Sequence, residues 1–166
     1  MTITVTGTKP RVVTVASDTT TTNTTFPAGA AAGTDRRYAF QDDIVAVINA
    51  AVDGEGLELQ AGGVIPHDIS LTNNSSVTSS TLSNEGLIEL NNKGGDISYT
   101  GAGDVRSYGT SAEAIKINAA AGNVTFNQTG GVLYADDAEV VEINSIAQAI
   151  ARLNNDIATS TFHIRR

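Results

Sequence analysis

The chain contains no cysteine and no tryptophan, and only 5% of its 166 residues are aromatic. Disulfide bonds and cysteine-ligated metal sites are therefore excluded. The shortage of aromatic rings is more typical of stacked aliphatic side chains than of an aromatic-rich binding groove. Because 40% of the residues are hydrophobic, a chain of this length is still able to bury one sizeable core.

Basic residues are also few. Ten lysines and arginines stand against 18 aspartates and glutamates, which leaves a net charge of −8, and the arginines pair only at Arg36-Arg37 and Arg165-Arg166. This charge argues against binding to a phosphate backbone, so we expect no nucleic-acid partner. The N-terminus lacks a basic, apolar leader and no apolar run approaches the length of a bilayer span, so we expect no membrane partner.

The sequence offers no converging set of catalytic residues. His67 and His163 are almost a hundred residues apart and have no zinc-type spacing. Stacking of the chain would gather one carboxylate cluster, but its members lie at glycine-flanked or strand-ending positions, which favours solvated turns. The cluster consists of Asp104, Asp136, Asp137 and Glu139. We therefore expect no enzyme, no catalytic residue, no cofactor and no metal site.

A repeat of about 27 residues runs from Leu57 to Asn144. Asp-Ile-Ser-Leu-Thr at 68–72 returns as Asp-Ile-Ser-Tyr-Thr at 96–100 and as Asn-Val-Thr-Phe-Asn at 123–127, at offsets of 28 and 27 residues. A second series begins at Leu57, Ile88, Ile115 and Val141, and a third at Val77, Val105 and Val132. Three series with one period indicate repeated modules of three strands.

This period predicts a mainly β protein, a short right-handed parallel β-helix of about four coils with three strands each. In the second series the apolar residues flank one polar residue, which we expect to point outward. These outward residues are Glu58, Glu89, Lys116 and Glu142, and the strands close with Gln60, Asn91, Asn118 and Asn144. We expect the amides to form hydrogen-bonded ladders at the corners, and the glycine pairs at 62–63, 94–95 and 130–131 to supply turns.

The flanking segments are interpreted as caps and an arm. Apolar residues with helical spacing predict capping helices at about 38–52 and 145–158, the second starting with a capping box. The first 35 residues contain two β-prone runs, a threonine-rich stretch and an Ala/Gly run, and we interpret them as an extended N-terminal arm. Residues 36–166 would form the body, with a short C-terminal tail.

Both ends of the chain are candidates for binding neighbours, because they carry apolar or cationic side chains outside the coils. In the arm these residues are Ile3, Val5, Val13, Val15 and Phe26, and at its junction with the body they are Arg36 and Arg37. In the tail they are Phe162, Ile164, Arg165 and Arg166.

A chain rich in Thr, Asn, Gly and Ala, with an extended arm and a few stacked coils, resembles a bacteriophage capsid decoration (cement) protein or a related short β-helix virion protein. The residues that carry this resemblance are Asp68–Thr72, Asp96–Thr100, the column Asn91, Asn118 and Asn144, and the Thr19–Thr25 stretch.

The resemblance implies a structural virion protein on the capsid surface, a homo-oligomer with a trimer favoured, that bridges neighbouring subunits of the major capsid protein. The alternative is a carbohydrate-binding or polysaccharide-cleaving β-helix module of a tail fibre or baseplate, with Asp104, Asp136 and Asp137 at its groove.

Overall fold

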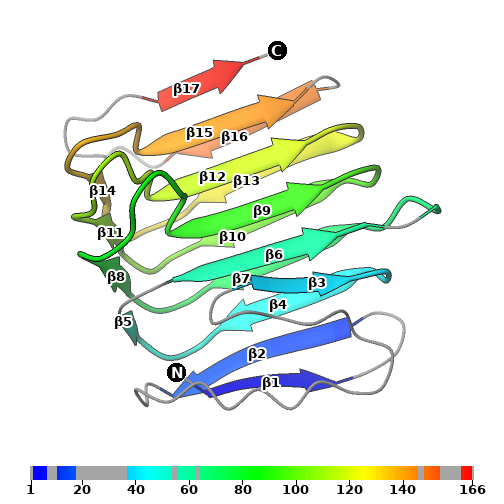
Figure 1. Ribbon diagram of the computed structural model, residues 1–166, viewed down its shortest axis with the longest axis horizontal. Helices are drawn as coiled ribbons and strands as arrows, with labels where there is room; N and C mark the ends of the chain where they lie inside the picture. Colours follow the sequence, from blue (N-terminus) through cyan, green and yellow to red (C-terminus); the bar gives the residue numbers. More distant parts are fainter. Residues whose placement is uncertain are drawn as a thin grey trace.

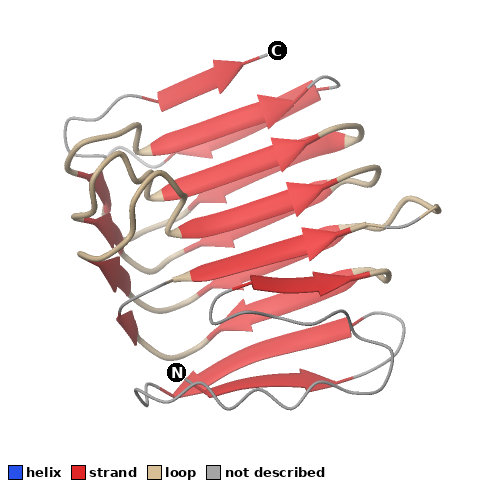
Figure 2. Ribbon diagram, in the orientation of Figure 1, coloured by secondary structure: helices blue, strands red, loops and turns tan. Residues whose placement is uncertain are grey.

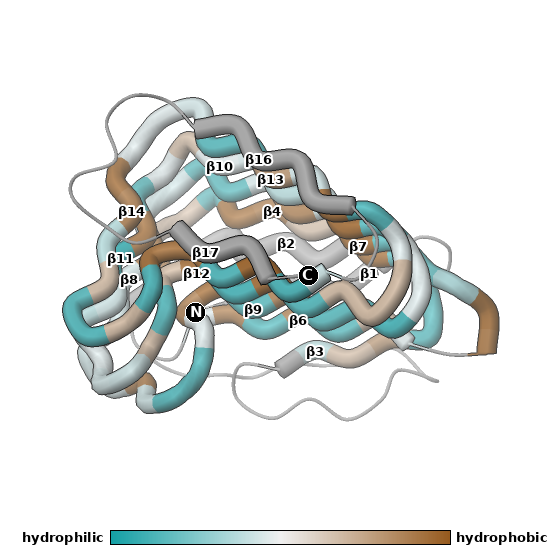
Figure 3. Tube along the Cα trace, turned by 90° about the horizontal axis from the view of Figure 1, so that it is seen from above, coloured by the Kyte–Doolittle hydropathy of each residue, from teal (hydrophilic) through white to brown (hydrophobic). Residues whose placement is uncertain are grey.

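A computed structural model describes residues 2–6, 11–17, 37–53, 56–62, 64–145, 148–153 and 162–165. These residues form strands and turns, with no helix in the described ranges (Figure 2). The strands stack into a parallel β-solenoid in which each coil adds one strand to each of three sheets (Figure 1). Seen along the axis of stacking, the three sheets form the three sides of the coil (Figure 3). The predicted parallel β-helix is therefore confirmed in its main feature.

The largest sheet has seven strands, in the order β1-β2-β4-β7-β10-β13-β16. Neighbouring strands are parallel except for β1 and β2, which pair antiparallel. The strands are Thr2–Thr6 (β1), Arg11–Ser17 (β2), Ile44–Ile48 (β4), Ile69–Asn73 (β7), Ile97–Gly101 (β10), Asn123–Gln128 (β13) and Gln148–Leu153 (β16).

The other two sheets are parallel throughout. The six-stranded sheet contains Phe162–Arg165 (β17), Val141–Ser145 (β15), Ile115–Ala119 (β12), Ile88–Asn92 (β9), Leu57–Ala61 (β6) and Arg37–Phe40 (β3). The four-stranded sheet contains Leu133–Ala135 (β14), Val105–Ser107 (β11), Val77–Ser79 (β8) and Val52–Asp53 (β5).

The register of the strands follows the sequence repeat. Ile97 of β10 pairs with Ile69 of β7 and Val124 of β13, as the Asp-Ile-Ser motif predicts. The second series also aligns as predicted, with Ile115 between Ile88 and Val141. The third series is wrong by one residue in its last member, because Val105 pairs with Leu133 and not with Val132.

The core is a set of aliphatic columns with one aromatic pair. Tyr99 and Phe126 stack with ring centroids 4.8 Å apart and an interplanar angle of 9°. Burial raises the pKa of Tyr99, whose hydroxyl donates a hydrogen bond to Oε1 of Gln128 at 3.2 Å. Each fully buried Leu, Ile or Val contributes roughly 1.5–3 kcal/mol relative to an exposed one. The columns include Leu57, Ile88, Ile115 and Val141, and Leu59, Leu90, Ile117 and Ile143.

The corner between β9 and β10 is organised by Asn92, a buried residue that the sequence did not single out. Its Oδ1 accepts hydrogen bonds from the backbone N–H groups of Gly94 and Gly95, and its Nδ2 donates to the carbonyl of His67 in the preceding coil. The predicted turns at the glycine pairs 94–95 and 130–131 are present. The side chain of Asn92 therefore provides hydrogen-bond partners for backbone groups at this corner.

The helix predicted at about 38–52 is wrong. This segment forms β3, β4 and β5, a coil of its own ahead of the four predicted ones. Ile44, Ala46 and Ile48 are buried while Val45 is exposed, which is the period-two alternation of a strand. The apolar residues of this segment fit both helical and strand spacing. The strand forms because β4 pairs with β7, and the β-branched Val45 and Val47 favour the pleated surface of a sheet.

The helix predicted at about 145–158 is wrong where the structure describes it. Residues 148–153 form the strand β16, which pairs parallel with β13. The free edge of β13 satisfies the backbone of this segment, and this outweighs the helical spacing of its apolar residues. Ser145 belongs to β15, and residues 146–147 and 154–158 of the predicted helix lie outside the described residues.

The extended arm predicted for residues 1–35 is not shown as a separate unit. Its two β-prone runs form β1 and β2, and β2 pairs parallel with β4 of the first coil. The predicted partner-binding residues Val13 and Val15 lie in register with Ala46 and Ile48, both of which are buried. The threonine-rich stretch and the Ala/Gly run lie outside the described residues.

Candidate functional site

The outer side of the six-stranded sheet carries a column of mixed charge, which runs Glu58, Glu89, Lys116 and Glu142. Lys116 lies between Glu89 and Glu142 in the register, as the sequence predicts. Its Nζ is 3.0 Å from Oε2 of Glu142 and 3.3 Å from Oε1 of Glu113. The prediction that the whole column points into solvent is wrong in part, because Glu58 and Glu142 are buried.

Glu113 is a member of this cluster that sequence reasoning missed. It lies two residues before β12, as Glu139 lies two residues before β15, and only 7% of its surface is exposed. Burial raises its pKa, although the ion pair with Lys116 opposes this effect. Its Oε2 has no hydrogen-bond partner among the described residues. One carboxylate oxygen is thus held out of water without compensation, which makes the cluster dependent on its single lysine.

The pKa of Lys116 reflects the same balance. Burial lowers it, but the hydrogen bond to Glu142 and the charges of Glu113 and Glu142 outweigh burial, so the pKa is raised overall. A raised lysine pKa adds to stability at every pH below the ordinary lysine value and is lost only when the pH rises through the folded-state pKa. Lys116 is therefore charged at neutral pH, and its ion pairs stabilise the fold there.

Beside the charges runs a ladder of asparagine amides. Nδ2 of Asn118 donates to Oδ1 of Asn91 at 2.8 Å, and Nδ2 of Asn144 donates to Oδ1 of Asn118 at 2.8 Å. The predicted ladder is confirmed for Asn91, Asn118 and Asn144 but not for its fourth predicted member, Gln60. Its predicted place at the corners is wrong, because the three asparagines lie within strands. Asn91 ends the ladder by donating to Oε1 of Glu58 at 2.9 Å. The amides and the charges therefore form one hydrogen-bonded surface.

Replacing Asn118 with alanine is expected to lower the free energy of unfolding by about 1–2 kcal/mol, because it removes both ladder bonds and takes away the donor that Asn118 provides to the half-buried Oδ1 of Asn91. Urea denaturation followed by circular dichroism measures this loss. The control is Asn74→Ala, since Asn74 makes an amide bond with Asn49 at an exposed position, where the loss should stay below about 0.5 kcal/mol. Equal losses in the two variants would mean that the ladder adds nothing to stability.

A second ladder follows the corner that precedes the strands of the seven-stranded sheet. Oδ1 of Asp43 accepts the backbone N–H of Asp68 at 3.0 Å, and Oδ1 of Asp68 accepts that of Asp96 at 2.8 Å. Asp96 in turn accepts the backbone N–H of Asn123 at 2.7 Å. Each carboxylate thus replaces a ladder bond between coils, which explains why the repeat begins with aspartate. Nδ1 of His67 lies 3.2 Å from Oδ1 of Asp43, within hydrogen-bond distance at the same corner.

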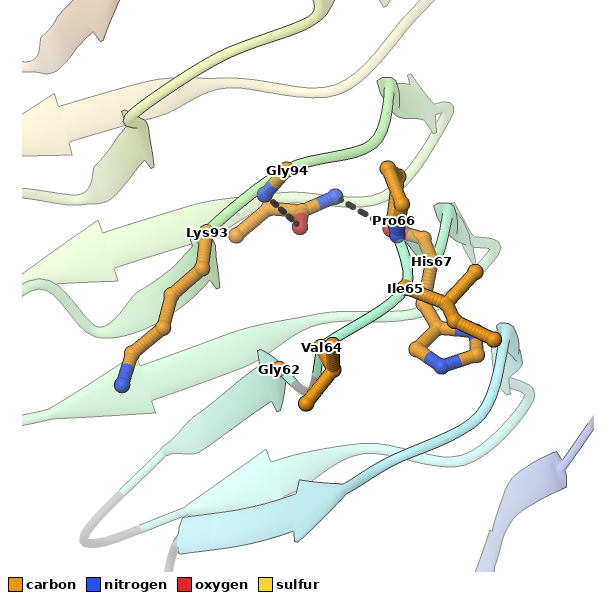
Figure 4. Close-up of a pocket in the computed structure, with 8 residues that line it drawn as sticks. Gly62, Val64, Ile65, Pro66, His67, Lys93 and Gly94 are labelled. Atoms are coloured by element: carbon orange, nitrogen blue, oxygen red, sulfur yellow. Dashed lines mark hydrogen bonds between the residues drawn. The ribbon is translucent and has the colours of Figure 1, made fainter.

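A shallow pocket lies where the segment joining β6 to β7 projects beyond the corners of the next two coils (Figures 1 and 4). Val64 and Ile65 are strongly exposed there, at 104% and 69%. The other residues that line the pocket are Gly62, Pro66, His67, Asn92, Lys93 and Gly94. The lining therefore combines the apolar Val64, Ile65 and Pro66 with the polar His67, Asn92 and Lys93.

The carboxylates predicted for a saccharide groove lie on the four-stranded side of the coil, but they do not converge. Asp104 accepts two hydrogen bonds from Arg106, both at 3.1 Å, and the backbone N–H of Val132 at 2.8 Å. Asp136 accepts the hydroxyl of Tyr134 at 2.8 Å, and Asp137 is exposed. Asp104 and Asp136 are four register positions apart, about 13 Å along the strand, which exceeds the separation used by paired glycosidase carboxylates.

The predicted partner-binding residues fall on the two ends of the solenoid. Ile3 and Val5 lie in β1, opposite Val15 and Val13. In β17, three of the predicted residues lie in register with β15: Phe162 with Val141, Ile164 with Ile143 and Arg165 with Asn144. Arg37 starts β3. Phe26, Arg36 and Arg166 lie outside the described residues. The role of all these residues in partner binding remains a prediction.

No group of three or more His, Cys, Asp or Glu residues in the described ranges is placed to hold a metal ion. Within the same ranges, no helix has the length and apolarity required to span a bilayer.

Comparison with known proteins found no match for this chain among protein-family models, curated proteins or solved structures.

Proposed function

We propose that this chain is a structural protein of a bacteriophage particle, a capsid decoration or cement protein that bridges subunits of the major capsid protein at the capsid surface. The carrying observation is that each of the three sheets ends, within the described ranges, on strands that pair on one side only. An edge strand presents a row of backbone donors and acceptors to which another chain is able to add.

The body between these edges suits a scaffold. Its core of aliphatic columns is closed by side-chain ladders on two of its sides, and four consecutive coils share one register. Such a solenoid transmits load along its axis because every coil contacts only its neighbours. On a symmetric shell, many weak contacts of this kind would add up through avidity, and a trimer would present three sets of edges at once.

The binding segments of this proposal are the strands at the two ends. Residues 2–6 form the outermost strand at one end, and residues 162–165 form the outermost strand of the six-stranded sheet at the other. The predicted partner-binding residues in these strands are Ile3, Val5, Phe162, Ile164 and Arg165. We infer that a capsid subunit extends one sheet and that a second copy of this chain extends another.

The location is tested with antibodies against this chain and particles purified on a density gradient from a lysate of the native host. We expect the chain to co-purify with DNA-filled heads and the antibody to label the head in a regular array under the electron microscope. Absence of the chain from the particle fraction, or label confined to tails, would refute the capsid location.

The binding segments are tested by removing residues 1–35, or residues 162–166, and adding the truncated protein to particles stripped of the native protein. Each truncated protein should keep the strand signal in circular dichroism, because the aliphatic columns of β6 to β15 remain, and each should lose occupancy on the shell by at least about tenfold. Full occupancy by both truncated proteins would show that the ends do not bind the capsid.

A further inference from the structure

Two tyrosines lie together on the outer side of the four-stranded sheet. Of the four tyrosines in the chain, Tyr38 and Tyr99 are fully buried in the core. Tyr108 is 46% exposed and follows β11, and Tyr134 lies in β14 and is half-buried. Their ring centroids are 5.3 Å apart, with an interplanar angle of 45°. Every tyrosine that does not serve the core is therefore gathered at one place on the surface.

Hydrogen-bonding groups surround the two rings. Arg106 is the cross-strand partner of Tyr134, and Asp104, Arg106 and Tyr108 occupy alternate positions along one strand, so all three face outward. Asp104 accepts both hydrogen bonds of Arg106. Asp136 accepts the hydroxyl of Tyr134, and the same contact raises the pKa of that hydroxyl. We call these five residues the tyrosine patch.

The backbone beneath the tyrosine patch is fixed before any ligand arrives. The N–H of Tyr108 donates to the carbonyl of Ser79 at 2.7 Å, and the N–H of Asp136 donates to the carbonyl of Ser107 at 3.0 Å. These bonds continue the ladder of β8, β11 and β14 past the ends of the strands. The rings are consequently held on a rigid surface, which lowers the entropy lost when a ligand binds.

We propose that the tyrosine patch binds a neutral saccharide. The apolar faces of sugar rings pack against exposed tyrosine rings, and the planar Arg106 and Asp136 side chains are able to orient sugar hydroxyls by hydrogen bonds. The proposal is independent of the capsid function and uses residues that function does not involve.

Charge selects a neutral ligand over an anionic one. Asp104 already neutralises Arg106 through an ion pair, and its hydrogen bond to Arg106 raises the pKa of the guanidinium, with Tyr108 adding to the effect. No salt bridge to Asp136 is found in the described part of the chain, and the whole chain carries a net charge of −8. Sulfated sugars and uronic acids would therefore be repelled.

Size selects a saccharide over a protein partner. A stable protein interface buries about 800 Å² on each side around an apolar centre. The residues next to the tyrosine patch are exposed and polar, so two rings form its whole apolar area. The neighbouring exposed residues are Ser80, Thr81, Thr110, Ser111 and Asp137.

Intrinsic tyrosine fluorescence tests the proposal, because the chain lacks tryptophan. The full chain is titrated with maltohexaose, cellohexaose, mannohexaose, chitohexaose and polygalacturonate. At least one neutral hexasaccharide should cause a saturable change, and polygalacturonate should not. Tyr108→Ala and Tyr134→Ala should each weaken binding about tenfold or more, and Asp136→Asn a few-fold.

The control variant is Val64→Ala. Val64 is fully exposed in the segment between β6 and β7, so this variant should bind saccharide as the unchanged protein does. Circular dichroism establishes that each variant is folded. No binding of any neutral hexasaccharide up to millimolar concentration, or binding that both tyrosine variants retain, would refute the proposal. A self-association of the chain in sedimentation velocity that Tyr108→Ala abolishes would also refute it, because the occupant would then be a protein.

Discussion

Replacing Gly103 with alanine is expected to lower the free energy of unfolding by about 3 kcal/mol or more, or to prevent folding. A Cβ atom at this position would lie 2.0 Å from the backbone oxygen of Ser75 and 2.5 Å from its carbonyl carbon. Both atoms belong to the preceding coil, so the clash is relieved only by moving one coil away from the next. Urea denaturation monitored by circular dichroism measures the change.

Gly130 supplies the matched control for this substitution. It lies at the equivalent corner of the next coil, but the nearest atom to its Cβ position is the backbone oxygen of Ala102 at 3.5 Å, an ordinary contact. Gly130→Ala should therefore change stability by less than about 1 kcal/mol in either direction. If both variants were equally stable, close stacking of the coils at Gly103 would be contradicted.

Replacing Lys116 with methionine is expected to have the second largest effect. Methionine keeps most of the aliphatic stem but removes the cation that pairs with both Glu113 and Glu142. We expect a loss of about 2 kcal/mol at pH 7. This is less than the 3–5 kcal/mol lost on breaking a fully buried pair, because 23% of the Lys116 side chain is exposed.

The loss should depend on pH with a defined sign. Without Lys116, Glu113 loses its ion pair, and burial already raises the pKa of Glu113 above its ordinary value. A raised carboxyl pKa means that the folded state binds protons more tightly than the unfolded state, so the stability of the variant rises as the pH falls through that pKa. The deficit relative to the unchanged protein should accordingly shrink between about pH 7 and pH 4.

Lys93→Met is the control for the loss of one positive charge, because Lys93 is exposed on a corner turn. It should change stability by less than about 0.5 kcal/mol at either pH. The double variant Lys116→Met with Glu142→Gln should recover part of the loss at pH 7. A deficit that is the same at pH 4 and pH 7 would show that Lys116 acts through packing and not through charge.

The coils were predictable because their signal is repetitive. Asp68, Asp96 and Asn123 occupy equivalent positions at the starts of three strands. Asp68 accepts the backbone N–H of Asp96, and Asp96 accepts the backbone N–H of Asn123. The first coil was missed, although Asp43-Ile44 carries the same Asp-Ile signal. The valines and isoleucines of this coil fit both helical and strand spacing. Only the pairing of β4 with β7 favours the strand over the helix.

The surface sites were less predictable than the coils. The amides Asn91 and Asn118 recur at the repeat period, so their ladder follows from the sequence. Tyr108 has no equivalent in the other coils, so it carries no periodic signal, and it meets Tyr134 through the way the chain turns between strands. Glu113 is matched by Glu139 in the next coil, but its ion pair depends on Lys116, whose register partners Glu89 and Glu142 are acidic.

The sequence by itself determined the parallel coil, its inward aliphatic columns and the amide ladder, because a stacked register demands the same residue type at the same place in successive turns. The tertiary structure alone decided that the flanking segments are strands, that Glu58 and Glu142 are buried, and that Tyr108 meets Tyr134. These outcomes depend on contacts between segments far apart in the chain, where a free sheet edge or a neighbouring side chain outweighs local preference.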